Sequence, residues 1–202
     1  MAWLIDGTPI DPEFNLEFEW VGPGTSAVRQ LLARPQALTD VPPIRLQRAQ
    51  HSRKTSMPLD FFRPGAIWVV SDRFRMIVRE LEPQQNQYFA VTFHDKTGAD
   101  LGVLFHLMNV TQGRDVLIPE RSDMYASSRE VKDSSGELVR ICQWHLHGHP
   151  KHLVARKEEI GAMHLWRGRK SLPTRLFFSD ELMKRTGDAG LRELVSYPIV
   201  ET

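Results

Sequence analysis

Short segments with a period of two dominate this chain and limit what it can fold into. Between Glu13 and Trp20 apolar residues occupy every second position, and the same alternation returns in residues 87–94 and 101–107. A period of two places the apolar side chains on one face, which is the pattern of a half-buried β-strand. We therefore expect strands in all three segments, and we expect the last two to pair as an antiparallel hairpin.

Two segments combine a short apolar strand, a Ser-Asp step and a helical pattern. After residues 67–70, Ser71 precedes apolar residues spaced at i, i+3, i+4 and i+7 across residues 74–81. After residues 175–178, Ser179 precedes a second short amphipathic stretch. A serine at this place accepts a hydrogen bond from the free amides of the first helical turn, so both segments predict a capped helix. One loose match of this kind does not by itself establish a repeat.

Weaker sequence patterns predict the remaining secondary structure. We expect a short helix over about residues 25–34 and further strands at residues 44–46, 129–132, 138–144, 163–166 and 193–200. Many short strands with few helices, in no regular alternation, predict an α+β fold: a single domain with a mostly antiparallel sheet and two or three short helices. Within it, we expect residues 1–57 to form an N-terminal strand, a short helix and a basic loop packed on, or extending, an α+β domain of residues 58–202.

The near-neutral composition hides an uneven distribution of charge. The 202 residues carry 26 Lys+Arg and 25 Asp+Glu, which argues against a uniformly basic nucleic-acid-binding surface. Residues 1–24 hold five acids and no base, whereas residues 25–79 hold ten bases and three acids. The balance therefore leaves room for a polarised surface that suits one protein partner.

Cysteine content and hydropathy indicate the compartment. The single cysteine, Cys142, excludes an intrachain disulfide and a cysteine-based zinc site, which favours a reducing compartment. The longest apolar run is five residues, and the N-terminus lacks the pattern of a secretory signal. We expect a cytoplasmic protein with no membrane partner, and we expect Cys142 to be a small core residue.

A histidine-rich segment offers the first candidate chemistry. His145, His147 and His149 could hold zinc or iron, because a His-x-His pair on a strand places two imidazoles on one face. The nearby acids Glu158 and Glu159 supply no evident third ligand. The alternative is a group of histidines at the exposed end of a strand, so we assign no metal, no cofactor and no catalytic residue.

Two loops without internal periodicity are the candidate partner-binding surfaces, because exposed loops on a rigid scaffold commonly carry recognition. The first carries a basic stretch that would suit nucleic acid, an acidic protein surface or only solvent, and it lacks the interleaved aromatic residues of a single-strand reader. In the second, a methionine and a tyrosine could anchor a partner or cover the edge of the core. The candidate residues are Arg45, Arg48, Arg53 and Lys54 in the first loop, and Asp123, Met124 and Tyr125 in the second.

Several segments together resemble immunity family eleven of the bacterial polymorphic toxin systems. The resemblance spans about residues 58–198, matches residues 118–157 poorly and leaves the first 57 residues uncovered. The segments that carry it are Pro58-Leu59-Asp60-Phe61, the strand and helix of residues 68–81, Leu107-Met108-Asn109-Val110, Asp115-Val116-Leu117, and the strand and helix of residues 176–191 ending in Gly190-Leu191.

This resemblance implies a cytoplasmic protein that binds a cognate toxin and blocks its active site or substrate path, without enzymatic activity of its own. Affinity would come from a few desolvated anchors inside a polar rim. Two alternatives remain: a small metal-dependent enzyme that uses His145, His147 and His149, and a nucleic-acid-binding regulator that uses the basic stretch of residues 45–54. The sequence leaves the oligomeric state open.

Overall fold

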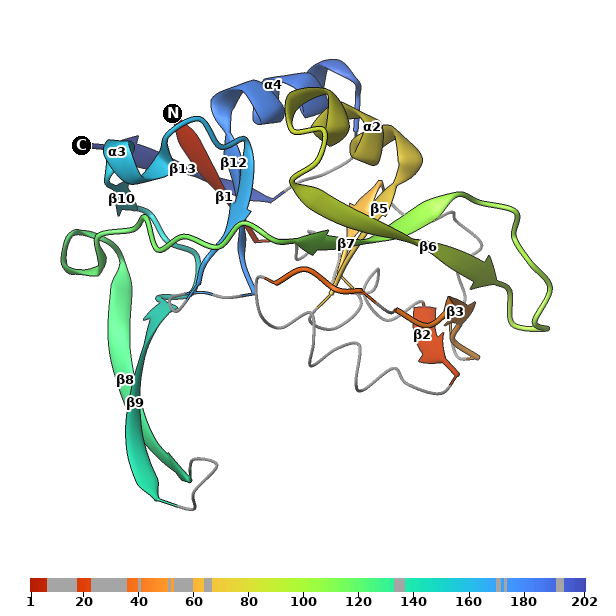
Figure 1. Cartoon of the computed structure of the whole chain (residues 1–202), viewed down its shortest axis with the longest axis horizontal. Helices are drawn as coiled ribbons and strands as arrows, with labels where there is room; N and C mark the ends of the chain where they lie inside the picture. Colours follow the sequence, from red (N-terminus) through yellow and green to blue (C-terminus); the bar gives the residue numbers. More distant parts are fainter. Residues whose placement is uncertain are drawn as a thin grey trace.

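Two β-sheets lie beneath a pair of helices, and a two-stranded hairpin extends away from them (Figure 1). The structure is a computed structural model of the chain. It describes residues 1–6, 18–22, 36–39, 41–50, 52, 60–63, 67–132, 137–169, 172, 174–191 and 195–202. Of the strand expected over residues 13–20, residues 13–17 lie outside the described residues, and the remainder is confirmed as part of strand β2 (Phe18–Val21). The expected helix near residues 25–34 lies outside the described residues.

The first sheet has six strands in the order β2-β3-β6-β7-β5-β4. Its strands are β2 (Phe18–Val21), β3 (Ile44–Arg48), β4 (Phe61–Phe62), β5 (Trp68–Ser71), β6 (Asn86–His94) and β7 (Phe105–Val110). The predicted pairing of β6 with the next strand is confirmed, but that strand begins at Phe105 and not at Leu101. The reason is local: Gly102 has a φ of 65° and donates its amide to the Asp100 carboxylate, so the chain turns before it pairs.

The second sheet has five strands in the order β10-β13-β1-β12-β11. Its strands are β1 (Ala2–Ile5), β10 (Val154–Ala155), β11 (Leu165–Arg167), β12 (Leu176–Ser179) and β13 (Ser196–Glu201). The strands predicted near residues 163–166, 175–178 and 193–200 are confirmed with shifted ends. Sequence reasoning missed β1, which lies between β13 and β12 and is buried along most of its length. A central strand buried on both faces shows no alternation.

The α+β class is confirmed, with strands predominating, but both large sheets are mixed. β3 pairs in parallel with β6, and β10 pairs in parallel with β13, so a purely antiparallel sheet would be a wrong description. The division at residue 57 stays a prediction. β1, β2 and β3, which precede it, are all built into the two large sheets.

Helices α2 (Asp72–Leu81) and α4 (Asp180–Asp188) start at the predicted caps. The Phe74 amide donates to Ser71 Oγ at 3.3 Å, and the Leu182 amide donates to Ser179 Oγ at 3.2 Å. Two shorter helical elements are α3 (Lys157–Ile160) and the 3₁₀ turn η2 (Pro119–Arg121). In the part of the chain that is described, none of the helices has the length and apolar character needed to cross a membrane.

Removing either cap is expected to destabilise the fold. Ser71→Ala and Ser179→Ala should each lower the free energy of unfolding by about 1 kcal/mol, because an amide of the first turn loses its acceptor. Urea unfolding measures the loss. Ser179→Asp, which keeps an acceptor oxygen, is the control and should lose much less. An alanine variant as stable as the wild type would contradict the capping role.

Both sheets share one apolar core. This cluster is formed by side chains from the two sheets and from both helices, and its members include Ile5, Phe61, Trp68, Val70, Phe74, Val78, Met108, Leu165, Leu176, Phe178 and Leu182. Each sheet also carries a separate cluster, which contains Leu46 and Phe93 in the six-stranded sheet and Leu4 and Phe177 in the five-stranded sheet. The shared cluster makes the two sheets one packed body.

A buried carboxylate also joins the two sheets. Glu82, at the end of α2, accepts hydrogen bonds at Oε1 from the backbone amides of His164 (2.5 Å) and Leu165 (3.2 Å), at the start of β11. Its Oε2 accepts from the side-chain amides of Asn86 (3.1 Å) and Gln112 (3.2 Å). Glu82 therefore connects the six-stranded sheet to the five-stranded sheet, and each of its two carboxylate oxygens accepts hydrogen bonds.

Candidate functional site at the base of the hairpin

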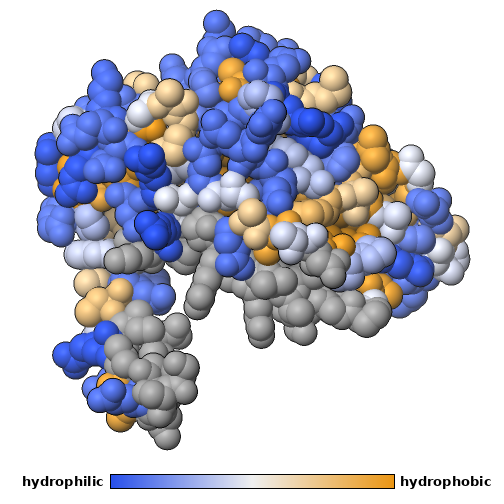
Figure 2. Space-filling model, viewed as in Figure 1, coloured by the Kyte–Doolittle hydropathy of each residue, from blue (hydrophilic) through white to orange (hydrophobic). Residues whose placement is uncertain are grey.

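The hairpin consists of β8 (Met124–Lys132) and β9 (Leu138–Leu146), and we call residues 124–146 the β8–β9 arm. Its register runs from Met124 opposite Leu146 to Lys132 opposite Leu138, which confirms and lengthens the predicted hairpin. Among the described strands, β8 and β9 pair only with each other, so each has an edge without a strand partner. Figure 2 shows the arm standing clear of the body, with hydrophilic and apolar residues mixed along it.

The base of the arm is anchored in the core by Met124. This side chain is 8% exposed and packs in the cluster of the five-stranded sheet, where Trp144 and Leu146 also contact it. A buried side chain cannot anchor a partner without leaving the core, so the proposed contact role of Met124 is corrected to an internal one. Trp144, expected in the core, is half-buried.

Tyr125 is the exposed aromatic residue at this base, with 44% of its surface accessible. Its ring stacks on His145 at 5.4 Å between centroids and lies 4.7 Å from the ring of His147. His145 also contacts Ser127, with 2.7 Å between Nε2 and Oγ. The alternation of β9 does bring the two histidines to one face, as predicted, and they contact the tyrosine ring there.

The third predicted histidine does not join this pair. His149 Nδ1 lies 2.5 Å from the hydroxyl of Tyr197 in β13, away from the Tyr125 ring. No group of three or more His, Cys, Asp or Glu side chains suited to a metal occurs among the described residues. The arrangement of His145, His147 and Tyr125 is therefore an aromatic stack, a geometry suited to contact with a planar or apolar group.

Asp123 organises the chain that returns from the arm. Its carboxylate accepts the backbone amides of Lys151 at 2.7 Å and His152 at 2.8 Å. These hydrogen bonds, with that of His152 first, hold the pKa of Asp123 below its usual range. The backbone amide of His147 also donates to the Asp123 carbonyl. Asp123 thus positions the turn of residues 147–152 beside Tyr125.

A pocket of about 460 Å³ opens between the base of the arm and Leu172, Thr174 and Arg175. Tyr125, Trp144, His145 and Arg175 contribute to its lining. Arg175 is ion-paired with the buried Asp6 and donates to the Asp6 carbonyl at 2.8 Å, and burial lowers the pKa of its guanidinium. Sequence reasoning missed this contribution, because the segment around Arg175 carries no signal that it meets the arm.

Of the basic residues predicted as another contact surface, the two that the structure describes lie in the six-stranded sheet. Arg45 and Arg48 belong to β3, and Arg53 and Lys54 lie outside the described residues. Arg48 is 7% exposed and its guanidinium lies 4.9 Å from the ring centre of Phe18, which corrects its proposed surface role. Arg45 is half-buried. The structure therefore does not bring Arg45 or Arg48 together with Tyr125.

Cys142 is exposed, and its assignment to the core was wrong. It lies in β9, and among the described residues only the base of this two-stranded sheet packs against an apolar cluster. The alternation of strand residues predicts a buried face only where a second layer covers the sheet. That condition is a tertiary property and is not visible in the local sequence.

Comparison with known protein families identifies the class. The chain belongs to the immunity protein family Imm11, which it matches over residues 7–201. The match includes residues 7–57 and the arm, which the resemblance seen in the sequence left uncovered or matched poorly. No curated protein matches the chain.

Proposed function

We propose that this protein protects its cell by binding a cognate bacterial toxin in the cytoplasm and covering the toxin's active site or substrate path. The observation that carries the proposal is the match to an immunity protein family over residues 7–201. The protein would act by contact alone, without a cofactor or a catalytic residue of its own.

The β8–β9 arm is the surface that we assign to this contact. Tyr125 offers a large exposed ring that the stacked His145 holds in place, and tyrosine is among the residues that most often dominate binding energy at interfaces. The pocket beside Tyr125 can receive a side chain of the partner. A separate two-stranded sheet is only marginally stable in water, so a partner that packed against the arm would also stabilise it.

The shape of the arm supports a mechanism of occlusion. It extends from the body as a narrow element (Figure 1), so it can enter a concave site that the body could not. Its free strand edges can pair with an extended segment of the toxin. The uneven charge of the sequence would then select the partner and speed the encounter.

Co-expression with the toxin encoded beside this gene tests the proposal. Cells that produce the toxin alone should stop growing, and cells that also produce this chain should grow. A catalytically dead toxin serves as the control for expression burden. Growth arrest that persists although both proteins accumulate in folded form would contradict the proposed function.

Truncating Tyr125 tests the assigned surface. Tyr125→Ala is expected to weaken toxin binding about tenfold, because the ring is exposed and its loss leaves the core intact. Met76→Ala is the matched control: Met76 is 54% exposed but lies on α2, on the other side of the molecule from the arm (Figure 1). Calorimetry measures both affinities. Equal toxin affinities for the two variants would show that the base of the arm is not part of the interface.

A further inference from the structure

We infer that the chain is an internal duplication: two copies of one sheet-and-helix module, the second of which is completed by the N-terminal strand. The first module consists of β3, β4, β5, α2, β6 and β7. The second consists of β10, β11, β12, α4, β13 and β1. Apart from Ser-Asp at the two helix starts, the sequence gives little sign of this duplication. The evidence for it is the spatial correspondence of the two modules.

Strand order and strand direction agree throughout. The first module has the order β3-β6-β7-β5-β4, and the second has the order β10-β13-β1-β12-β11. In each, the first two strands are parallel and every later neighbour is antiparallel. The helix leaves the fourth strand of the order in both modules. An otherwise antiparallel sheet does not need a parallel pair of strands. Its presence at the same place in both strand orders is therefore a specific point of agreement.

The pairing register is also the same. In the strand that leads into each helix, Val70 and Phe178 occupy equivalent positions directly before the capping serine. Their cross-strand partners are Phe61 and His106 for Val70, and Leu165 and Trp3 for Phe178. These pairs define the correspondence between the two modules residue by residue.

The backbone hydrogen bonds around the two caps follow this correspondence. The amide of each capping serine donates to the residue that precedes the edge strand: Ser71 to the Asp60 carbonyl at 2.8 Å and Ser179 to the His164 carbonyl at 2.9 Å. The next amide in each module donates to the residue that precedes the central strand. These bonds are Asp72 to Leu104 (3.3 Å) and Asp180 to Met1 (2.9 Å).

Side chains at equivalent positions perform the same task with different chemistry. His106 Nε2 lies 2.9 Å from Asp72 Oδ1, and Trp3 Nε1 donates to Asp180 Oδ1 at 3.0 Å. In both modules a ring nitrogen from the central strand thus contacts the aspartate at the start of the helix.

The apolar clusters obey the same correspondence. The cluster shared by both sheets contains equivalent residues from each module: Phe61 and Leu165, Trp68 and Leu176, Val70 and Phe178, Phe74 and Leu182, Met108 and Ile5. The separate cluster of each sheet matches the other in the same way. Its equivalent pairs are Ile44 and Leu153, Leu46 and Ala155, Phe62 and Trp166, Val69 and Phe177, Val91 and Ile199, Phe105 and Ala2, Leu107 and Leu4.

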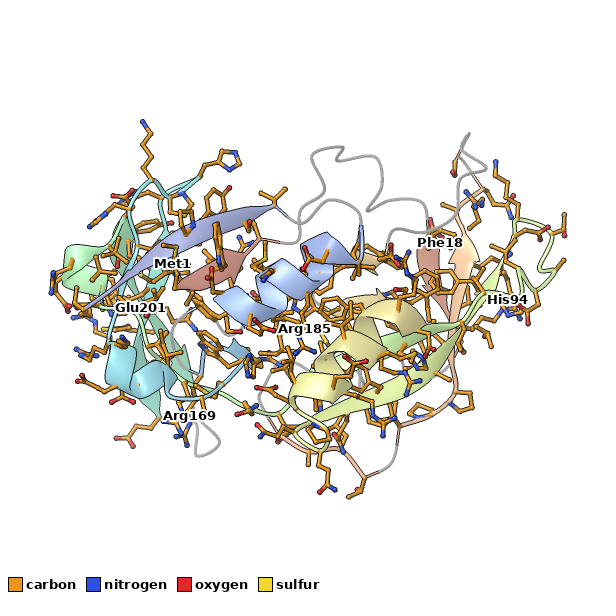
Figure 3. All side chains as sticks on the ribbon, turned by 90° about the horizontal axis from the view of Figure 1, so that it is seen from above. Met1, Phe18, His94, Arg169, Arg185 and Glu201 are labelled. Atoms are coloured by element: carbon orange, nitrogen blue, oxygen red, sulfur yellow. The ribbon has the colours of Figure 1, made fainter. Side chains whose placement is uncertain are left out.

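Chain order differs at one place only. In the first module β6 runs directly into β7, whereas in the second β13 ends at Glu201 and its partner β1 begins at Ala2. The Met1 ammonium lies 3.1 Å from Glu201 Oε1, and Figure 3 shows both residues at one end of the five-stranded sheet. The second module is therefore a circularly permuted copy, in which Thr202 and Met1 are equivalent to His94 and Leu104.

The duplication distinguishes the strands that both modules share from the segments that only one of them has. Leu117 bridges Ala155 antiparallel as Trp20 of β2 pairs with Leu46, so β2 has its counterpart there. Among the described residues the β8–β9 arm has no counterpart in the first module, and it precedes β10 in chain order. The arm is thus outside the strand pattern that the two modules share, although Met124 at its base packs in the core of the five-stranded sheet. This gives a reason, independent of Tyr125, for assigning a specialised role to it, although the duplication itself does not depend on the proposed function.

Circular permutation tests the inference. A copy of residues 95–103 is placed between Thr202 and Met1, which recreates the connection of the first module, and the chain is opened elsewhere. One permutant is opened between Pro12 and Glu13, and another between Ser134 and Ser135. At least one is expected to unfold cooperatively within about 4 °C of the wild-type melting temperature, since openings at different places in the chain are not equally tolerated.

The copied connection must also adopt its original turn. In the native chain the amides of Thr97 and Ala99 donate to Asp95 Oδ1, at 2.8 and 2.9 Å. NMR should show the same amide shifts and exchange protection in the copy as in the original, and a glycine-serine linker of equal length serves as the control. Unfolding of both permutants, or a folded permutant in which the copy stays unstructured, would overturn the inference.

Discussion

Replacing Glu82 by glutamine is expected to lower the free energy of unfolding by about 3 kcal/mol. The carboxylate is buried, and both of its oxygens accept hydrogen bonds: Oε1 from the amides of His164 and Leu165, Oε2 from Asn86 and Gln112. Glutamine carries an NH₂ group in place of one of the two carboxylate oxygens. At that position its N–H groups would face the N–H donors that now bond to the oxygen. The buried donors there would lose their acceptor, and the contact between the two sheets would weaken.

Glu80→Gln is the matched control for this variant. Glu80 lies on the same helix, but its side chain is 64% exposed and pairs with Arg185 at 3.2 Å on the surface. Such pairs contribute little, so we expect a change within about 0.5 kcal/mol. Chemical unfolding measures both variants. If Glu82→Gln were no less stable than Glu80→Gln, Glu82 would not be the link between the sheets.

Phe178→Ala is expected to cost about 4 kcal/mol, which makes it the most severe truncation that we predict. Phe178 is fully buried in the cluster shared by both modules. Its ring centre lies 5.7 Å from that of Phe74 and 5.9 Å from that of Phe61, both of which belong to the other module. The cavity would therefore open between the modules, where neither sheet can close it alone.

The control for Phe178 comes from the same sheet. Val200 in β13 is 51% exposed, so Val200→Ala should change stability by no more than about 0.5 kcal/mol. Urea unfolding followed by circular dichroism gives both values. A loss below about 1 kcal/mol for Phe178→Ala would mean that the shared cluster does not hold the modules together.

The sequence predicts the elements whose signals are local. Ser71 and Ser179 start the two helices as expected, because capping depends on a few consecutive residues. β1 could not be found in this way, since residues 2–5 pair on either side with strands more than 170 residues away in the chain, and their side chains pack into apolar clusters that form only in the folded protein. The parallel pairs could not be predicted either, because nothing in β3 or β10 indicates its direction relative to its partner.

The residues of the candidate site show the same difference between what local sequence predicts and what tertiary packing decides. Tyr125 is exposed as a contact residue needs to be, but it lies in strand β8 and not in the expected loop. The burial of Met124 and Arg48 depends on what packs against them, and so does the exposure of Cys142. The duplication is nearly invisible in the sequence for a related reason. Equivalent core positions such as Phe62 and Trp166 need only be apolar, so topology and register match although the residues differ.

Titration of the purified chain with its proposed cognate toxin tests the central claim most directly. We predict a saturable complex with a Kd below about 100 nM, in the range of stable specific protein complexes, and loss of toxin activity in proportion to the complex formed. Absence of binding between the folded chain and the active toxin, or binding that leaves the toxin fully active, would contradict the proposal that this Imm11 family member neutralises a cognate toxin.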